Sequence, residues 1–355
     1  PFGERLLSRG LDILDRELDE QFLADGAHFE LSPMYHNVLV WDVLDLLALS
    51  NVADRPALAA MAERFSAVAR DGVAWSRHMA HPDGEVSFFN DAAIGVAPTA
   101  AELAAYAQRL GVGLANEADK DGRAVQIENL RASGYAVVQS RDYKAILDLA
   151  EVGPPYQPGH AHADTLSFEM SVRGRRCLVN TGVSTYRVGK ERDGERATRA
   201  HNTVELGGRN SSDVWAGFRV ARRAVPFERS IECSADTCTV KCAHSGYRVP
   251  PTNAVHAREW CFSRSAISII DRVTGDIRTG RAYLHFHPDC TLTEAKGDWR
   301  IEIGERALMV QSNGSPATIG DYLWHEGFGR SEPAKRLVFE FEETLTVTLR
   351  LGDAQ

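Results

Sequence analysis

The chain has 355 residues, of which 44% are hydrophobic and 25% are charged, and its formal net charge at pH 7 is −9. These values are ordinary for a soluble globular protein and allow two domains with separate cores. The acidic balance and the lack of a basic stripe argue against a nucleic-acid partner. No apolar run approaches the roughly 20 residues that span a bilayer. No signal peptide is visible, but the chain begins at Pro1 rather than at methionine, so the sequence does not exclude a segment upstream of it.

Hydrophobic residues at helical spacing predict that the first third of the chain is helical. A first helix is indicated by apolar residues from Leu6 to Phe22, and further helices are expected at about 33–49, 55–70, 73–79 and 100–110. A polar and aromatic loop, 84–91, lies before the last of them. The short connections predict a series of antiparallel helix pairs.

The composition changes at 111–122, which is rich in glycine and charge and is interpreted as a link. Beyond it, alternating patterns predict strands at 135–138, 144–147, 166–172, 176–180, 203–206, 238–242, 266–270, 282–287 and 345–351. Turn dipeptides recur between them, which favours an antiparallel β-sandwich. We therefore predict an α+β fold with a helical domain at 1–115 and a sandwich domain at 116–355.

The six cysteines include no CxxC pair. Cys238, Val240 and Cys242 alternate with polar residues, which indicates one buried strand face rather than a metal cluster.

Two histidines at alternate positions, His160 and His162, stand in a strand-like stretch. In an extended strand their side chains would point to the same face, where both could bind a metal, or one could do so while the other transfers protons. A hydrogen-bonded pair of surface histidines fits the spacing equally well. A cupin-like metal enzyme is a further reading, but it leaves the helical first third unexplained.

Several segments carry a family resemblance when they are taken together. Residues 26–36 (GAHFELSPMYH) and 158–169 (PGHAHADTLSFE) are the most distinctive, and shorter matches follow at 180–182, 199–204, 215–219 and 285–289. In this order they resemble the heparinase II/III-like family of polysaccharide lyases. The resemblance implies an incomplete (α/α) toroid, then a large antiparallel β-sandwich, with the active site in the cleft between them.

The resemblance also implies a reaction, the β-elimination of a uronic-acid-containing polysaccharide that leaves a 4,5-unsaturated uronate end. The C5 proton is acidic because it lies next to a carboxylate, whose charge must be neutralised as the intermediate forms. A base removes this proton and an acid protonates the leaving O4. A tyrosine can do both if a cationic or polar neighbourhood lowers its pKa from about 10.

Site residues are carried over by position. Tyr35 matches the catalytic tyrosine, acting as base and acid, and His160 matches the catalytic histidine, which assists at the carboxylate or serves as base for the opposite epimer. His162, Asn180 and His201 match the positions that hold a structural metal, zinc rather than calcium. The family often has aspartate where this chain has Asn180, and an amide is a poorer zinc ligand than a carboxylate, which leaves calcium or no metal as alternatives.

Other residues are expected to support the reaction. His36 is expected to play a supporting role, either by orienting Tyr35 or by hydrogen-bonding the backbone, and Tyr186 either lines the cleft or is a core aromatic. The family's usual group for neutralising the substrate carboxylate lies upstream of this chain's first residue, so Asn90, Arg196 and Arg199 are the candidates here. Trp215 and Phe218 could stack on sugar rings, although a core position is favoured for Phe218.

The favoured function is therefore a lyase acting on a glycosaminoglycan, alginate or a bacterial capsule or exopolysaccharide, and the resemblance suggests a periplasmic or secreted protein. The alternative is a protein that binds or assembles acidic polysaccharides on the same scaffold without catalysis. Asn180 favours the alternative, whereas the presence of Tyr35, His160, His162 and His201 favours the lyase.

Overall fold

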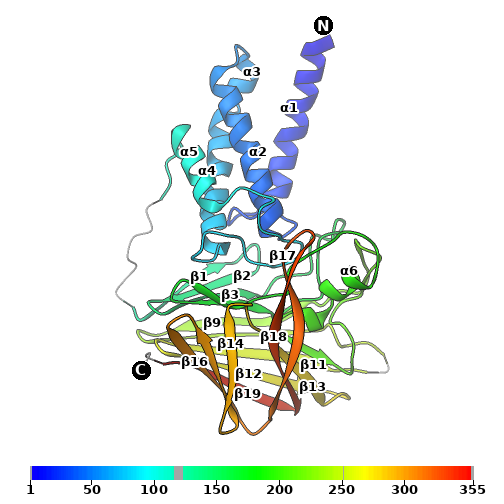
Figure 1. Ribbon diagram of the computed structural model, residues 1–355. Helices are drawn as coiled ribbons and strands as arrows, with labels where there is room; N and C mark the ends of the chain where they lie inside the picture. The colour runs from blue at the N-terminus through cyan, green and yellow to red at the C-terminus, as the bar shows by residue number, and fades with distance from the viewer. Residues whose placement is uncertain (1, 116–122, 251, 353–355) are drawn as a thin grey trace.

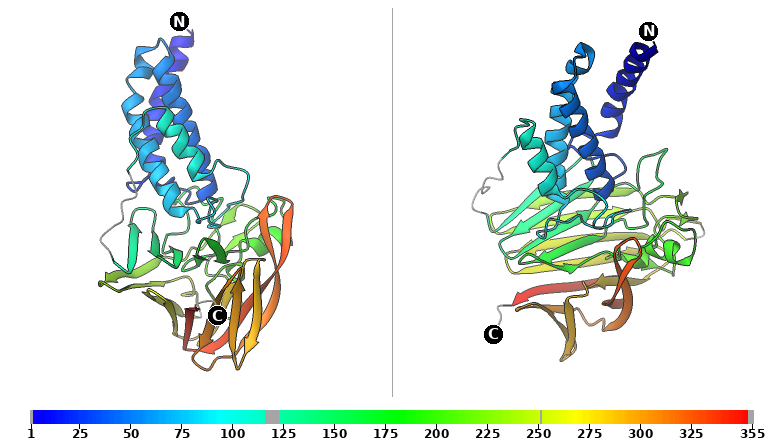
Figure 2. Two further views of the ribbon diagram at one scale, coloured as in Figure 1. Left: turned by 60° about the vertical axis from the view of Figure 1, so that its left-hand side comes forward. Right: turned by 45° about the horizontal axis from the view of Figure 1, so that its top comes forward.

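The computed structural model describes residues 2–115, 123–250 and 252–352, so the predicted link lies outside the described residues at 116–122. Helices occupy the first part of the chain, and they stand on one side of a larger part that is built of strands (Figures 1 and 2). The helices are α1 (Phe2–Gln21), α2 (Pro33–Val52), α3 (Pro56–Ala59), α4 (Ala62–Met79) and α5 (Ala100–Arg109).

Helix α4 corrects one expectation from the sequence. The separate helices expected at 55–70 and 73–79 are wrong, because α3 is a single turn and α4 runs without a break through Gly72. Gly72 is a packing residue: a Cβ added there would lie 2.6 Å from Val40 Cγ2 of α2. The glycine therefore lets α2 and α4 approach closely and does not end a helix.

The strands pair antiparallel in three larger sheets and one small one. The five-stranded sheet has the order β1 (Val125–Leu130), β2 (Tyr135–Ser140), β3 (Tyr143–Asp148), β4 (Phe168–Val172) and β5 (Arg175–Leu178). The eight-stranded sheet has the order β14 (Cys290–Ala295), β15 (Asp298–Ile303), β16 (Arg306–Ser312), β19 (Thr344–Gly352), β12 (Ala266–Thr274), β11 (Val255–Ser263), β10 (Thr237–His244) and β9 (Pro226–Cys233).

The four-stranded sheet has the order β17 (Ala317–Gly327), β18 (Arg330–Glu342), β13 (Thr279–His285) and β6 (Val204–Leu206). Strands β7 (Val214–Trp215) and β8 (Arg219–Val220) form a separate pair, and a short helix, α6 (Lys190–Glu195), precedes β6. Each strand predicted from the sequence overlaps one of these strands. The expected sheet-rich α+β architecture is confirmed.

One large hydrophobic core joins the sheets. It contains Leu147 of β3, Trp260 of β11, Ile269 of β12 and Phe339 of β18, all nearly inaccessible to solvent. Burial alternates strictly along β11, as expected of strands that turn one face to a shared core. The three large sheets therefore form one packed unit.

The cysteine prediction can be checked on β10. Cys238, Val240 and Cys242 are all buried, which confirms the single buried face. A disulfide between Cys233 and Cys238 closes the β9–β10 hairpin, a pairing that the spacing had not suggested.

Two smaller cores attach the helices to the sheets. Trp75 and Met79 of α4 pack with Tyr135 and Ile146 of the five-stranded sheet, and Trp75 Nε1 donates to Ser133 Oγ at 3.1 Å. At the start of α2, Met34 belongs to a cluster that includes Trp324 of β17. The first turn of α2 is thereby fixed against the strand-rich part.

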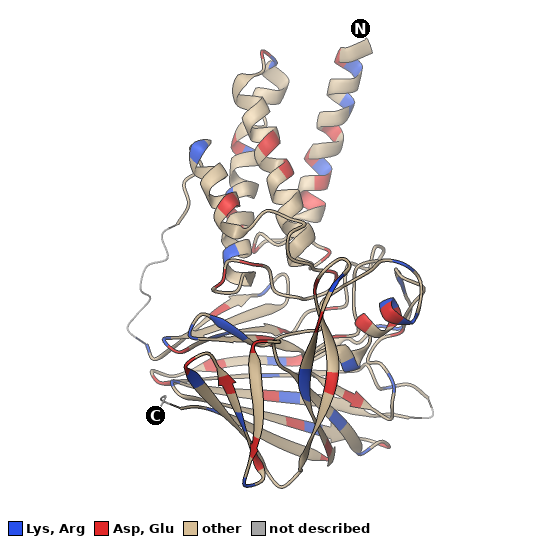
Figure 3. Ribbon diagram, viewed as in Figure 1, with Lys and Arg blue, Asp and Glu red and all other residues tan. Residues whose placement is uncertain are grey.

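Basic and acidic side chains are interspersed over both parts (Figure 3). Among the helices in the described ranges, none combines the length and the apolar character needed to cross a bilayer.

Candidate active site

Tyr35 and His160 meet where the helical part joins the strands. Tyr35 lies in the first turn of α2, where Ser32 caps the helix by accepting a hydrogen bond from the Tyr35 N–H at 3.2 Å. The Tyr35 and His160 rings have centroids 4.0 Å apart, and the Tyr35 hydroxyl is 3.1 Å from that of Tyr186. The phenol and the imidazole that the sequence singled out are therefore neighbours.

His160 and His162, which form an HxH motif, lie close together for a different reason from the one expected. His160 and His162 lie in the loop before β4, so the expectation that a strand aligns them is wrong. Instead they share Asp91: His160 Nδ1 lies 2.8 Å from Asp91 Oδ2, and His162 Nε2 lies 2.8 Å from Oδ1. A carboxylate on another loop aligns the rings.

Arg192 of α6 balances the charge of Asp91. Its guanidinium binds both carboxylate oxygens, with Nη2 at 2.7 Å from Oδ2 and Nη1 also bonded to Oδ1. Both side chains are completely buried. Burial raises the pKa of Asp91, but its bonds to His160, His162 and Arg192 outweigh this effect and hold the pKa well below its ordinary value.

The ionised state of Asp91 determines how His160 is protonated. A carboxylate only accepts hydrogen bonds, so His160 Nδ1 must carry the proton that it shares with Asp91. In the neutral imidazole, Nε2 is then left with a lone pair and can accept a proton.

Asn90 positions the surrounding loops. Its Nδ2 donates to the Leu31 carbonyl at 2.8 Å, and its Oδ1 accepts from the His162 N–H at 3.2 Å. Both ends of the amide are thus bound to backbone groups, which does not support the predicted contact with a substrate carboxylate.

The contacts of the two candidate arginines do not support a role in binding the substrate carboxylate either. Arg196 is buried, and its guanidinium donates to the carbonyls of Ala161 and Gly217, each at 2.8 Å. Arg199 is exposed, and no contact described for these residues joins its side chain to Tyr35 or His160. Arg196 therefore holds the HxH loop in place through the Ala161 carbonyl.

His36 hydrogen-bonds backbone groups through both of its ring nitrogens. Its Nδ1 accepts from the His28 N–H at 3.0 Å, and its Nε2 donates to the Gly72 carbonyl at 2.8 Å. Burial lowers the pKa of His36 to about 3, so it remains neutral. It ties the start of α2 to α4 and to the segment that precedes Tyr35.

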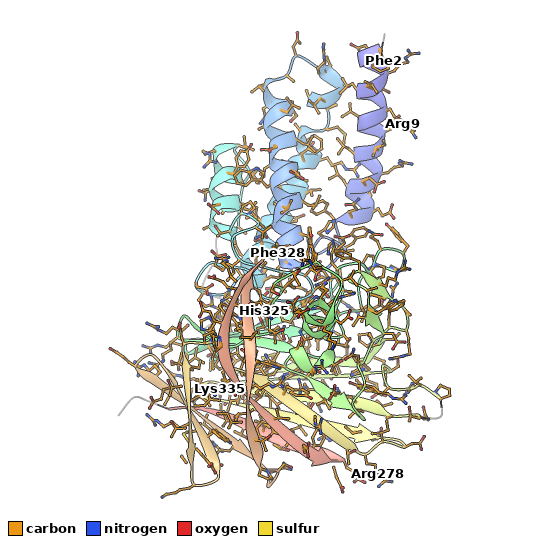
Figure 4. All side chains as sticks on the ribbon, turned by 45° about the vertical axis from the view of Figure 1, so that its right-hand side comes forward. Phe2, Arg9, Arg278, His325, Phe328 and Lys335 are labelled. Carbon is orange, nitrogen blue, oxygen red and sulfur yellow. A yellow bond between two sulfur atoms is a disulfide. The ribbon has the colours of Figure 1, made fainter. Side chains whose placement is uncertain are left out.

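Aromatic rings surround the pair. Tyr186 contacts Phe218 and Phe328, with centroids 5.2 and 4.8 Å away, and Phe218 lies 5.8 Å from His160. Phe218 is 43% exposed, so the core position favoured for it is wrong. Phe328, at the β17–β18 turn, reaches the base of the helices (Figure 4). Trp215 is exposed to the same extent but makes no ring contact with the pair among the described residues.

The neighbourhood of Tyr35 raises its pKa rather than lowering it. Burial is the largest cause, and the negative charges of Asp91 and Glu30 add to it. The bond to Tyr186 and the charge of Arg192 act in the opposite direction but do not prevail. The lowered pKa that Tyr35 would need to act as both base and acid is therefore absent, and the phenol is protonated at neutral pH.

The predicted metal ligands fit a metal only in part. His162 and His201 have ring centroids 5.3 Å apart, and the Nδ1 atoms of both rings have no hydrogen-bond partner among the described residues. The Asn180 amide is occupied, since Nδ2 donates to the Phe88 carbonyl at 2.9 Å and Oδ1 accepts from the Asn202 N–H at 3.3 Å. The described residues contain no group of three His, Cys, Asp or Glu side chains suited to an ion. They do not supply the four ligands of a structural zinc site.

Asp91 and Arg192 were missed as site residues. Asp91 ends the polar and aromatic loop at 84–91, and Arg192 lies in α6. Nothing local indicates that they pair, because they stand 101 positions apart in the chain.

Two family descriptions match this chain. Residues 122–351 match the family described as heparinase II/III-like, C-terminal, and residues 4–109 match heparinase II/III N-terminus. A heparin-sulfate lyase of Pedobacter heparinus is 27% identical over 215 residues, which cover 57% of this chain and 32% of that protein.

Solved structures show the same fold. The heparan sulfate lyase HepC of Pedobacter heparinus matches with a TM-score of 0.75 and 18% identity, over 99% of this chain and 57% of that one. A structure of heparinase III matches with a TM-score of 0.76 and 16% identity, over 99% of this chain and 58% of that one. The chain therefore spans little more than half of these structures. Since the two family matches cover most of its length, the chain belongs to the heparinase II/III-like family.

Proposed function

We propose that this protein is a polysaccharide lyase that cleaves an acidic, uronic-acid-containing polysaccharide by β-elimination. The observation that carries the proposal is the contact between Tyr35 and His160, which come from different parts of the fold. The family membership and the named activities of the relatives support a glycosaminoglycan as the substrate class.

The proton states of the two residues suggest a division of roles. His160 Nε2 takes the C5 proton, because Asp91 holds the proton on Nδ1. The electron pair of the C5–H bond forms the C4=C5 double bond as the C4–O4 bond breaks. Tyr35, which is protonated at rest, gives its proton to O4. Return of the proton from His160 to Tyr35 restores both residues.

A tyrosine that acts alone as base and acid is the other route within this proposal. It requires Tyr35 to lose its proton before the reaction, which the burial of the phenol and the nearby carboxylates oppose. The raised pKa of Tyr35 therefore favours His160 as base and Tyr35 as acid.

Two further features belong to the proposal. Helices α1–α5 would form part of an (α/α) toroid, in keeping with the matched structures, which are longer than this chain. A periplasmic or extracellular location agrees with the Cys233–Cys238 disulfide, because disulfides persist in oxidising compartments. No step of the reaction is assigned to a metal.

The decisive experiment follows the ultraviolet absorbance of the conjugated C4=C5 bond when the protein is mixed with heparan sulfate, heparin or alginate. We expect at least one polymer to give a signal with the wild-type protein, and Tyr35→Phe and His160→Ala to lose it. Arg278→Ala is the control, because Arg278 lies at the far end of the strand-rich part (Figure 4).

The alternative is a protein that binds acidic polysaccharides without cleaving them. The amide at Asn180 is the feature that favours it. If no polymer gives a signal while binding persists unchanged in Tyr35→Phe, the alternative replaces the lyase.

A further inference from the structure

A cavity of about 490 Å³ lies where helix α1, the β1–β2 turn and the loop before His160 meet. We call it the junction cavity, and its principal lining residues are Phe29, Leu31, Arg131, Pro154, Tyr156 and Arg229. This volume falls in the range typical of small-molecule sites, which often form between domains. The Tyr35–His160 pair does not line it.

The junction cavity is nevertheless close to the candidate active site. Leu31 precedes Tyr35 by four residues, and Tyr156 precedes His160 by four. Four residues span at most about 14 Å, so each of the reactive residues lies within that backbone reach of the cavity wall. A polymer held at the reactive pair could extend into the cavity with a neighbouring sugar unit.

Two aromatic rings give the cavity a surface suited to sugars. Phe29 and Tyr156 meet edge to face, with centroids 6.1 Å apart, and Tyr156 is 63% exposed. The Tyr156 hydroxyl donates to the Glu20 carboxylate, which fixes the ring. The C–H faces of a pyranose ring pack well on such aromatic surfaces, because the ring face carries partial negative charge.

Two arginines give the cavity an affinity for anions. Arg131 is exposed and forms no ion pair within the described part of the chain. Arg229 is half-buried, and one nitrogen donates to Asn129 Oδ1 at 2.6 Å. Burial is the largest cause that lowers the pKa of Arg229, and the charge of Arg131 also lowers it, whereas Cys242, Asp148 and Asp25 act in the opposite direction. The two cations therefore act on each other. An anion between them would relieve this repulsion.

Acidic groups also face the cavity. Glu20, whose carboxylate accepts the Tyr156 hydroxyl bond, and the exposed Glu151 both line it, and the charges of Asp25 and Asp148 act on Arg229. The opposite wall is held in place, because Arg223 donates to the carbonyls of Pro154 and Pro155 at 2.9 and 2.7 Å.

We propose that the junction cavity binds an anionic sugar unit of the polysaccharide, at a distance from the bond that is cleaved. Arg131 and Arg229 would bind the carboxylate or sulfate group of this unit, for which a planar guanidinium is well suited. Phe29 and Tyr156 would contact its ring. This inference rests on the proposed function for the identity of the polymer.

Binding measurements test the inference without depending on turnover. The probe is heparan sulfate, titrated calorimetrically into Tyr35→Phe protein, with neutral dextran as a second probe. We expect Arg131→Ala and Tyr156→Ala, each added to Tyr35→Phe, to weaken heparan sulfate binding about five- to tenfold. Arg278→Ala is the matched control and should bind as the parent does. The loss should be smaller for Arg131→Ala at high salt, since screening weakens the ionic contact in the parent.

The outcomes separate this inference from the proposed function. If both cavity variants bind heparan sulfate as tightly as the Arg278→Ala control, the inference is overturned, whether or not the wild-type protein is a lyase. If the wild-type protein binds but never cleaves, the lyase proposal fails while weaker binding by the cavity variants still supports the subsite. In an active protein the KM for the polymer should rise more than kcat falls, and the reverse would overturn the inference.

Discussion

Asp91 gives the candidate site its geometry through a single carboxylate. One oxygen binds His160 and Arg192, and the other binds His162 and Arg192. The backbone reinforces this arrangement, because the Asp91 N–H donates to the His160 carbonyl at 3.1 Å. Asp91 is therefore a positioning residue that acts on the substrate through His160.

Replacing Asp91 should disable the base without removing it. We expect Asp91→Asn to lower kcat by about 10²-fold, because the amide no longer fixes the proton on His160 Nδ1. The pH profile of kcat/KM should change as well. The stability also falls, since Arg192 loses its counter-charge in a buried position, by about 3–5 kcal/mol.

A matched control separates the two effects of this substitution. Asp83 also binds a buried arginine, Arg176, at 2.6 Å, but no described contact joins it to the Tyr35–His160 pair. Asp83→Asn should lower the melting temperature and leave the pH profile unchanged. An unchanged pH profile in folded Asp91→Asn would refute the positioning role.

The raised pKa of Tyr35 leads to a second prediction, on the pH dependence of kcat. It is raised above its ordinary value near 10, so the phenol stays protonated throughout the neutral and mildly alkaline range. If Tyr35 is the acid, kcat should not fall with rising pH until the pH exceeds about 10. The measurement is kcat against pH on the best polymer. A rise of about tenfold per pH unit between about pH 7 and 9 would instead identify ionised Tyr35 as the base.

Helices and strands differ in how well the sequence predicts them. Apolar residues at regular spacing were sufficient for α2, β10 and β12, because one face of each packs on a core. The continuity of α4 through Gly72 could not be predicted, since a glycine that ends a helix and one that permits close packing look alike without the partner helix. The geometry of the HxH loop could not be predicted either, because Asp91, which aligns the two histidines, is 69 positions away from His160 in the chain.

The role of Gly72 at the α2–α4 contact can be tested with two glycines in helices. In Gly72→Ala the new methyl group would lie 2.6 Å from Val40 Cγ2, and the overpacking should cost about 1–3 kcal/mol of unfolding free energy. In Gly10→Ala of α1 the methyl group meets nothing within 4 Å, so the higher helix propensity of alanine should stabilise the protein by up to about 1 kcal/mol. Urea unfolding measures both. Equal effects of the two substitutions would contradict the packing role.

A buried charge cluster joins the eight-stranded sheet to the loops of the site. Arg258 of β11 binds both oxygens of Asp271 on β12, at 2.7 and 2.9 Å. Its Nη1 also donates to the carbonyls of Leu166 and Asn202, at 2.8 and 2.6 Å. Asn202 follows His201, and Leu166 follows the HxH loop. The core thus supports the site through Arg258.

This cluster should make the stability depend on pH in acid. Burial raises the pKa of Asp271, but Arg258 and His256 outweigh it and lower the pKa to about 2. A carboxylate with a lowered pKa stabilises the fold above its unfolded value, near 4. That contribution, about 2–3 kcal/mol, is lost as the pH falls from about 4 to 2.

Asp271→Asn should therefore have two effects. At pH 7 it should lower the unfolding free energy by about 3–5 kcal/mol, because Arg258 keeps its buried charge without a partner. Between about pH 4 and 2 the variant should lose less stability than the wild-type protein, since the group that titrates there is gone. Urea unfolding across this range measures both effects, with Asp321→Asn as the control for an exposed pair with Lys335 (Figure 4). If Asp271→Asn and the wild-type protein lost stability in parallel below about pH 4, Asp271 would not be the source of the acid sensitivity.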